Sequence, residues 1–215
     1  MKTPHSKADL HVHSRYSDKP SEWILRRVGA PECFTEPEKI YEVAKARGME
    51  FVTITDHNAI GGAVELQQKH PEDTFLGQEI TAHCPENGCK LHILAWGFSE
   101  EQHKEISRLR RNLYELVPYL KEQGILHSLA HPLYSNNAPK LTPEIYEKCV
   151  LLFKHFEALN GMHDAQGSLA STSVLKSLTP AKIDELANKH NLAPLWPDPH
   201  IKYFTAGSDD HSGIF

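Results

Sequence analysis

Residues 8–13 read Ala8-Asp9-Leu10-His11-Val12-His13, and polar and apolar side chains alternate along this stretch. Alternation with a period of two is typical of a β-strand, and it places Asp9, His11 and His13 on the same face. Two imidazoles on one face of a strand point in the same direction and can bind one metal ion. Because unpaired polar groups on a buried face are costly, the stretch predicts a strand that carries metal ligands.

Six further apolar runs predict β-strands, and each predicted strand has His, Asp or Glu in or just after its carboxyl-terminal part. The predicted strands are Ala8–His13, Phe51–Asp56, Thr74–Glu79, Leu91–Gly97, Ile125–His131, Phe156–Asn160 and Phe204–Asp209. Amphipathic stretches alternate with them, which is the pattern of βα units around a mainly parallel sheet. In a parallel α/β barrel the carboxyl ends of the strands build the active site. Each residue alone also has a structural explanation, such as a helix cap, but their joint occurrence favours one shared site.

Helix signals lie between the predicted strands. A capping box at Thr35–Glu38 predicts a helix that ends near Gly48. Ser99 predicts the start of a longer helix, which Pro118 should kink or divide. Further helices are expected from residue 142 and, as a pair, between residues 164 and 191.

Of the 215 residues, 40% are hydrophobic and 24% are charged, which suits a globular protein and excludes a wholly disordered chain. No run approaches the roughly 20 apolar residues of a membrane helix, and the N-terminus lacks the apolar core of a signal peptide. Twenty-eight acidic against 23 basic side chains give a net charge of −5, which argues against a dedicated nucleic-acid binder. We therefore expect a cytoplasmic protein without membrane contact.

We expect one barrel domain over residues 1–215. A barrel normally closes with a helix after its last strand, but the sequence continues for only four residues after His211. We therefore expect either a piece of a larger parent protein or an incomplete final layer.

The residue types at the predicted strand ends narrow the choice of metal. Imidazole and carboxylate without thiolate suit Zn²⁺, Mn²⁺ or Fe²⁺ and argue against a closed structural zinc site. The four cysteines predict no disulfide scaffold, and Cys84 and Cys89 are too widely spaced for a zinc knuckle. The candidate ligands are too many for one ion, so we expect a cluster of two or three divalent ions bridged by a carboxylate.

Several motifs, in this order along the chain, resemble those of the PHP (polymerase and histidinol phosphatase) family. They are DLHVHSRYSD at residues 9–18, ITDHN at 54–58, Glu79, His131-Pro132 and Asp209-Asp210-His211. The resemblance spans nearly the whole chain. It implies a distorted (β/α)7 barrel with up to three metal ions at its carboxyl-terminal face, and hydrolysis of phosphate esters.

The resemblance also implies a ligand set. The first ion would be bound by His11, His13, Glu79 and Asp209, and Glu79 would bridge to a second ion bound by His92 and His131. The third ion would be bound by Asp18, His57 and His211. His83 is an alternative to His92 but is more simply explained as a loop residue. Asp56 is expected to orient its neighbours rather than bind metal.

The sequence departs from the family pattern after Asp18, where Lys19-Pro20 replaces the usual glycine. The long loop that follows carries Trp23, Arg26 and Arg27. This loop could cover the substrate as a lid, or it could be a solvated insertion without a role in binding.

As a mechanism, the resemblance implies an ion-activated hydroxide that attacks the phosphorus of a small phosphorylated substrate, either a monoester or a diester. Arg15 and Asn160 could bind a non-bridging oxygen, although Arg15 could equally form a surface salt bridge. His211 or a metal-bound water could protonate the leaving group.

Three other functions stay open at this stage. An amidohydrolase-like reaction is disfavoured because no predicted strand end offers a bridging lysine. An exonuclease of the polymerase-associated type is disfavoured by the negative net charge of the chain. Arg108, Arg110 and Arg111 form a basic cluster, but they are more simply explained as residues of a solvated helix face. A metal-stabilised accessory domain of a larger protein is the third alternative, and an intact ligand set argues against it.

Overall fold

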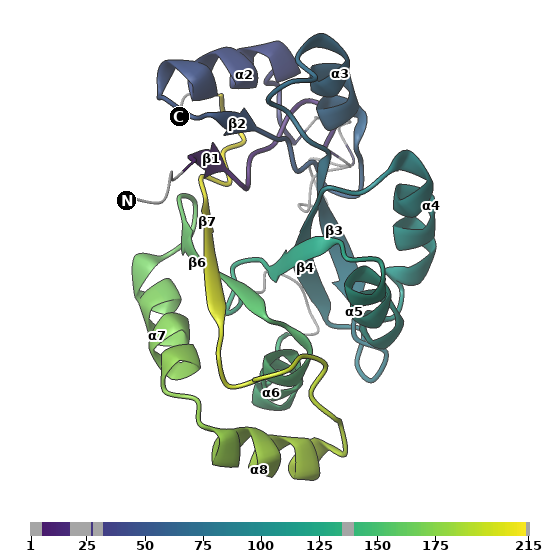
Figure 1. Ribbon diagram of the computed structural model, residues 1–215, viewed down its shortest axis with the longest axis vertical. Helices are drawn as coiled ribbons and strands as arrows, with labels where there is room; N and C mark the ends of the chain where they lie inside the picture. The colour runs from purple at the N-terminus through teal and green to yellow at the C-terminus, as the bar shows by residue number, and fades with distance from the viewer. Residues whose placement is uncertain (1–5, 18–26, 28–31, 135–139, 214–215) are drawn as a thin grey trace.

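The computed structural model describes residues 6–17, 27, 32–134 and 140–213 (Figure 1). The described strands are β1 (Ala8–Asp9), β2 (Phe51–Val52), β3 (Gly77–His83), β4 (Lys90–Trp96), β5 (Leu126–Leu129), β6 (His155–Asn160) and β7 (Tyr203–Gly207). The described helices are α2 (Pro37–Ala46), α3 (Gly61–Lys69), α4 (Glu100–Leu109), α5 (Leu113–Glu122), α6 (Pro143–Leu152), α7 (Ala165–Lys176) and α8 (Pro180–His190). Figure 1 shows the strands in the centre and the helices around the outside. The mixed α/β class expected from the sequence is confirmed.

The strands pair into two sheets. β1 and β2 form a parallel pair, and the other sheet has the order β3-β4-β5-β6-β7. β5, β6 and β7 are parallel, but β4 is antiparallel to both β3 and β5, so the expectation of a mainly parallel sheet is only partly correct. The connection between β3 and β4 is too short for a crossover helix, and such neighbours pair as a hairpin.

Outside these ladders, the described residues form three isolated single-residue bridges. Val12 pairs with Asp210, Val52 with Thr74, and His57 with Glu79, all in parallel orientation. The first two predicted strands extended to residues 13 and 56, but only two residues of each belong to a ladder. Within the described part of the chain, the ladders therefore form two bridged sheets, and a closed barrel is not established.

The apolar side chains divide by strand face. On β4, Leu91, Ile93 and Ala95 belong to the large core, which also includes the apolar faces of the helices. Leu94 and Trp96 alternate with them and belong to a small separate cluster together with Ala130. The even-numbered residues of β4 therefore share the inner face of the sheet, and the odd-numbered ones face the helices.

The helices follow the sequence with some exceptions. α2 begins at Pro37 after Glu36, which makes no side-chain cap, so the predicted capping box is wrong; Gly48 does adopt the expected left-handed conformation with φ +79°. The reciprocal capping box occurs instead at the start of α4, between Ser99 and Gln102.

The long helix expected between Ser99 and Gly124 is two helices. The break lies at residues 110–112, where Asn112 caps α5, whereas Pro118 lies inside α5 without dividing it. α3 was not predicted, because it begins with two glycines and lacks a clear apolar stripe. The predicted helices α6, α7 and α8 are confirmed, and Thr142 and Thr179 cap α6 and α8.

The longest described helix, α7, has 12 residues. None of the described helices has the length and apolar character needed to cross a membrane.

Candidate metal centre

Two fully buried histidines, His11 and His13, follow β1. The backbone of the segment after β7 lies beside them, with Asp209 N donating to His11 O at 2.6 Å and His13 N donating to Asp210 O at 3.0 Å. A Cβ atom on Gly207 would overlap the Cβ of His11. Only glycine therefore allows the end of β7 to approach the first ligand segment this closely.

The carboxylate of Glu79 lies at the centre of the candidate site and is fully buried. Five imidazoles surround it. Its Oε2 lies 3.4 Å from His11 Nε2, 3.3 Å from His13 Nε2 and 2.8 Å from His57 Nδ1, and its Oε1 lies 2.8 Å from His92 Nδ1 and 3.1 Å from His131 Nε2. Each oxygen thus faces its own group of nitrogens, which is the arrangement that a carboxylate bridging two cations requires.

Glu79 reaches this position from inside a strand rather than from its end. The sequence predicted a strand over residues 74–79, whereas β3 covers Gly77–His83. The alternation of inner and outer side chains continues beyond Glu79, because Ile80 and Ala82 face the large core. Pairing with β4 extends the strand and places His92 opposite Thr81, next to Glu79 on the inner face.

Asp209 provides a second buried carboxylate. Its Oδ1 lies 3.3 Å from His11 Nε2 and 3.2 Å from His13 Nε2, and its Oδ2 lies 3.4 Å from His163 Nε2. The backbone of Asp209 has φ +54° and that of His131 has φ +24°. Positive φ at non-glycine residues is strained and concentrates at functional sites.

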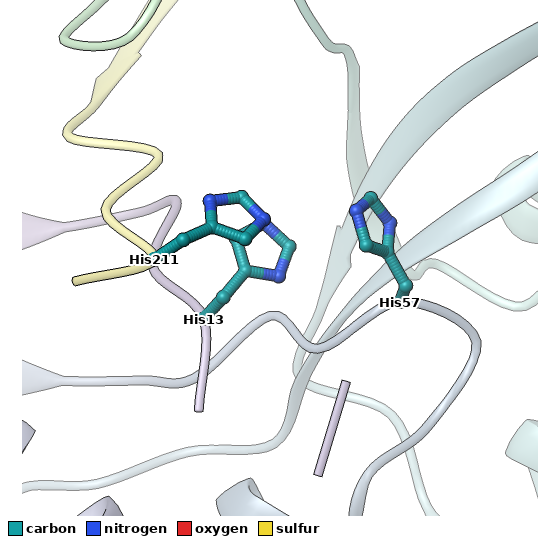
Figure 2. A group of neighbouring side chains, drawn as sticks. All are labelled: His13, His57 and His211. Atoms are coloured by element: carbon teal, nitrogen blue, oxygen red, sulfur yellow. The ribbon is translucent and has the colours of Figure 1, made fainter. Parts of the chain in front are cut away.

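A third group of imidazoles adjoins the first. The rings of His13 and His211 stack with centroids 4.1 Å apart, and the ring of His57 lies 4.6 Å from that of His13. Figure 2 shows His211 in front of His13, with His57 facing both from another segment. Asp18, the remaining predicted ligand of this group, lies outside the described residues, as do Trp23 and Arg26 of the loop that follows it.

Among the described residues, four groups of donor atoms lie close enough to hold an ion, with every ligand atom within 4.8 Å of the others in its group. They are His11 with His13 and Glu79, His13 with His57 and His211, His57 with Glu79 and His92, and His131 with His163 and Asp209. The structure thus brings together all the predicted ligands that it describes.

The hydrogen bonding of this cluster fits bound cations. In the part of the chain that the structure describes, His11 Nε2, His13 Nε2, His57 Nδ1, His92 Nδ1 and Glu79 Oε2 are buried and, although they lie close to one another, form no hydrogen bond of suitable geometry. Each such atom costs about 1–3 kcal/mol if it stays unsatisfied. Nitrogen and oxygen donors without thiolate suit Zn²⁺, Mn²⁺ or Fe²⁺, and a divalent ion would satisfy these atoms directly.

Outer contacts orient the imidazoles so that the free nitrogens face inward. His11 Nδ1 lies 2.8 Å from Glu157 Oε1, and His13 Nδ1 lies 2.9 Å from Ser17 Oγ. Asp56 accepts a 3.3 Å hydrogen bond from the same Ser17 hydroxyl, which agrees with the orienting role expected for it. Partners of this kind fix the tautomer and the ring orientation of metal-binding histidines.

The pKa values reflect the crowding of charges. Burial opposes the ionisation of Glu79, but the imidazoles of His57, His92 and His11 hold its pKa well below the usual range. Burial lowers the pKa of His57 and His211 to about 4, so both are neutral at pH 7, as ligands must be. Burial also acts on His13, but the carboxylates of Asp209 and Glu79 outweigh it and raise the pKa of His13 to about 9. A proton on that imidazole takes the position that a cation would occupy between the same groups.

Two predicted catalytic residues, Arg15 and Asn160, contact carboxylates. Arg15 pairs on the surface with Glu36 at 2.6 Å and Glu65 at 3.4 Å, so it forms the salt bridge that was the alternative to phosphate binding. Asn160 Nδ2 donates to Glu157 Oε2 and to Asp209 Oδ2, both at 3.0 Å. Its amide therefore holds two carboxylates in place. His211, with a side chain 26% exposed, lies in the third group as expected.

Two residues of the site were missed by sequence reasoning. His163 lies three positions after Asn160 and could have been found by extending the search beyond the end of the predicted strand. Glu32 lies 3.6 Å from His57 Nε2 but belongs to a turn-rich stretch that carries no strand signal. A cavity of about 150 Å³ adjoins His131 and His163, and Tyr134 contributes to its wall.

No established family model matches the sequence. The chain is 33% identical over 177 residues to the uncharacterised protein MJ1587 of Methanocaldococcus jannaschii, which covers 80% of this chain and 93% of that protein. It is 34% identical over 95 residues to a phosphoribosyl 1,2-cyclic phosphate 1,2-diphosphodiesterase of Eggerthella lenta, over 43% of this chain and 31% of that protein.

Solved structures share the fold at 16% identity. A candidate metal-dependent phosphoesterase of Bifidobacterium adolescentis has a TM-score of 0.59 over 97% of this chain and 88% of its own. An amidohydrolase of Chromobacterium violaceum has a TM-score of 0.59 over 95% and 87%. A two-domain protein of Bacteroides vulgatus, in which a PHP-like metal-dependent phosphoesterase is predicted, has a TM-score of 0.57 over 97% of this chain and 53% of its own. The resemblance to the PHP family is confirmed, and the chain belongs to the family of MJ1587 with a PHP-like fold.

Proposed function

We propose that the protein is a metal-dependent phosphoesterase. The observation that carries the proposal is the position of Glu79, whose two oxygens face two separate groups of imidazoles. A site for at least two cations held a few ångströms apart suits phosphate esters, whose charged oxygens need compensation on both sides of the phosphorus. The phosphodiesterase and phosphoesterase names among the compared proteins support this reaction class.

The proposal assigns the ions as follows. His11, His13, Glu79 and Asp209 would hold the first, Glu79, His92 and His131 the second, and His57 and His211 with Asp18 the third. His163 is added as a candidate ligand, because its Nε2 reaches Asp209 Oδ2 beside His131. When bound, divalent ions supply positive charge for the phosphoryl oxygens and acidify water.

The residues of the chain itself position this centre. Glu157 accepts from His131 N at 2.8 Å as well as facing His11, so one buried carboxylate sets two ligand segments. Asn160 ties Glu157 to Asp209. The proposal keeps His211 as a ligand of the third ion rather than as the proton donor to the leaving group, because its imidazole is neutral at pH 7 and its Nδ1 donates to Asp209 O at 2.8 Å.

We also propose that the seven strands form the distorted (β/α)7 barrel implied by the family resemblance. The bridges Val12–Asp210 and His57–Glu79 support it, because they connect the outermost strands of the larger sheet to the segments after β1 and β2.

The test is an assay of metal-stripped protein reconstituted separately with Mn²⁺, Zn²⁺ and Fe²⁺. We expect metal-dependent hydrolysis of an aryl phosphate monoester or diester, and no hydrolysis of an aryl amide. His13→Ala should lose bound metal and activity, whereas His70→Ala, whose ring stacks on Tyr41 and contacts Glu38, should keep both.

Two results would contradict the proposal. Hydrolysis of the amide with no action on phosphate esters would favour the amidohydrolase alternative, which the fold of the C. violaceum protein keeps open. Tight metal binding without turnover of any ester would favour a metal-stabilised accessory domain.

A further inference from the structure

The β3–β4 hairpin carries more than metal ligands on its inner face. Residues directly opposite on paired strands share a face, and the register pairs Thr81 with His92 and His83 with Lys90. Alternation therefore places His83 and Lys90 on the same face as Glu79 and His92, farther from the sheet centre. The residues between them, Ala82 and Leu91, belong to the large core on the other face.

Two arginines from the junction of α4 and α5 adjoin this end of the hairpin. Arg110 Nη1 donates to Thr81 O at 3.2 Å, and Arg110 O accepts from His83 N at 3.0 Å. Partial burial and the charges of Lys90, Arg110 and Arg111 lower the pKa of His83, which agrees with the pairing of Lys90 opposite His83 and with the backbone contact of Arg110. We call Lys90, Arg110, Arg111 and His83 the basic end of the hairpin.

The described carboxylates do not neutralise this group. Within the ranges that the structure describes, Lys90, Arg110 and Arg111 form no ion pair, whereas the neighbouring Arg108 is paired with Glu105 at 2.6 Å. The acidic residue of the hairpin turn, Glu86, is held by Lys148 at 2.6 Å and by the Tyr114 hydroxyl. An unneutralised basic group is notable in a chain of net charge −5.

The spacing relates the basic end to the metal centre. A strand rises about 3.3 Å per residue, so Lys90 lies about 7 Å from His92 along β4, and His83 lies about 13 Å from Glu79 along β3. A molecule with one anionic group at the metal centre could place a second at the basic end if the two were separated by a distance in this range.

We propose that the basic end of the hairpin binds a second anionic group, a phosphate or a carboxylate, on the substrate whose phosphate ester is hydrolysed at the metal centre. The inference rests on the proposed function and narrows the substrate class to small molecules that carry two separated anionic groups. Lys90 and Arg111 supply charge that no described carboxylate pairs with, and Arg110 positions the junction through Thr81.

A series of alkanediol phosphates tests the proposal. Each diol from ethane-1,2-diol to octane-1,8-diol is prepared as the monophosphate and as the bisphosphate, and both are assayed with the Mn²⁺-loaded protein. We expect about tenfold lower KM for the bisphosphate at intermediate chain lengths and no such advantage for the shortest diol. A matched series of phosphorylated hydroxy acids shows whether a carboxylate can replace the second phosphate.

Charge-removing variants locate the second contact. In Lys90→Gln and Arg111→Gln, the ratio of monophosphate KM to bisphosphate KM should fall towards one. Arg108→Gln is the matched control, because this arginine lies on the same helix end but already pairs with Glu105, and its ratio should equal that of the parent protein.

Binding measurements separate this inference from the proposed function. Calorimetric titration of the Mn²⁺-loaded protein with the pentane-1,5-diol monophosphate and bisphosphate gives the same comparison without turnover. Binding with no hydrolysis would contradict the phosphoesterase proposal but leave the second-anion site supported. Equal affinities for both compounds, or a bisphosphate advantage that survives in both variants, would overturn the second-anion site.

Discussion

Glu79 combines complete burial with an ionised carboxylate. Burial alone would favour the neutral acid, and the surrounding imidazoles reverse this preference. The same carboxylate contacts both the group of His11, His13 and His57 and the group of His92 and His131. The consequences of changing it should therefore exceed those of losing one ligand.

We predict that Glu79→Gln lowers kcat by more than about 100-fold, because outer contacts of metal ligands already contribute 10- to 100-fold and this residue binds directly. An amide has similar volume but brings no charge to offset two cations. Metal content by mass spectrometry should fall below that of the parent protein. Glu38→Gln, which affects surface contacts to His70 and Lys69, is the control. Full occupancy of two ions in Glu79→Gln would rule out the bridging role.

A second residue-scale prediction concerns His127, which is buried outside the metal centre. Its Nδ1 bonds the carbonyl of Ile125 at 2.8 Å, and burial lowers its pKa to about 4. The unfolded chain takes up a proton below the ordinary histidine pKa of about 6.5, whereas the folded protein does so only near pH 4. The free energy of unfolding should therefore fall by up to about 3 kcal/mol as the pH drops through this interval.

Denaturant unfolding of the chelator-treated protein at pH 7.5, 6, 5 and 4 measures this effect. His127→Leu keeps the apolar contacts to Phe153 and Trp196 but cannot be protonated, so its stability should fall less steeply with pH. Parallel curves for the two proteins would show that His127 does not contribute to the acid sensitivity.

At the scale of elements, the end of β7 and the segment after β1 act as one unit. Their backbones are joined at His11 and Asp209, and both carry ligands of the same candidate ion. Packing between them leaves no space for a side chain at Gly207, where an added Cβ would meet the backbone nitrogen of His11 at 2.7 Å.

We predict that Gly207→Ala destabilises the protein by about 1–3 kcal/mol, the usual cost of overpacking, and weakens metal binding because the two ligand segments are forced apart. Gly167→Ala is the matched control. Gly167 lies in helix α7, and an added Cβ there would come no closer than 3.8 Å to Asp164 Oδ2. That control should be neutral or more stable by up to about 1 kcal/mol. Urea unfolding and metal titration of both variants provide the measurement, and equal behaviour of the two would contradict the close-packing argument.

At the scale of the whole molecule, the metal centre collects side chains from both sheets. Ligands that bind only the folded state raise its stability by mass action. Added Mn²⁺ or Zn²⁺ should therefore raise the melting temperature of the metal-stripped protein in proportion to the logarithm of its concentration. Removing residues 209–215 should abolish hydrolysis and most of this increase, because Asp209 and His211 are lost together. A truncated protein with the parental increase in melting temperature would place the bound ions elsewhere.

The sequence predicted the strands and most of the described ligands because alternation and ligand residue types are local properties. It did not predict that β4 runs antiparallel to its neighbours, since strand direction depends on the path of the chain and not on the pattern within a strand. Glu79 was expected at a strand end because the extension of β3 to His83 depends on pairing with β4, which the pattern within β3 does not show. His163 contacts Asp209 because separate segments of the chain pack together. Arg15 pairs with two carboxylates, Glu36 and Glu65, and this pairing also depends on the fold.

The pairing of Ser208 with His11, 197 positions apart, has a consequence for the order of events during synthesis. Until the segment that contains Asp209 has left the ribosome, His11 and His13 have neither of the backbone partners that hold them nor the carboxylate that faces their Nε2 atoms. A nascent chain that has already formed the β3–β4 hairpin therefore presents Glu79 and His92 without the remainder of the first ligand group. Assembly of the complete candidate centre is thus a late step, which requires the segment around Asp209 and accompanies the docking of β7.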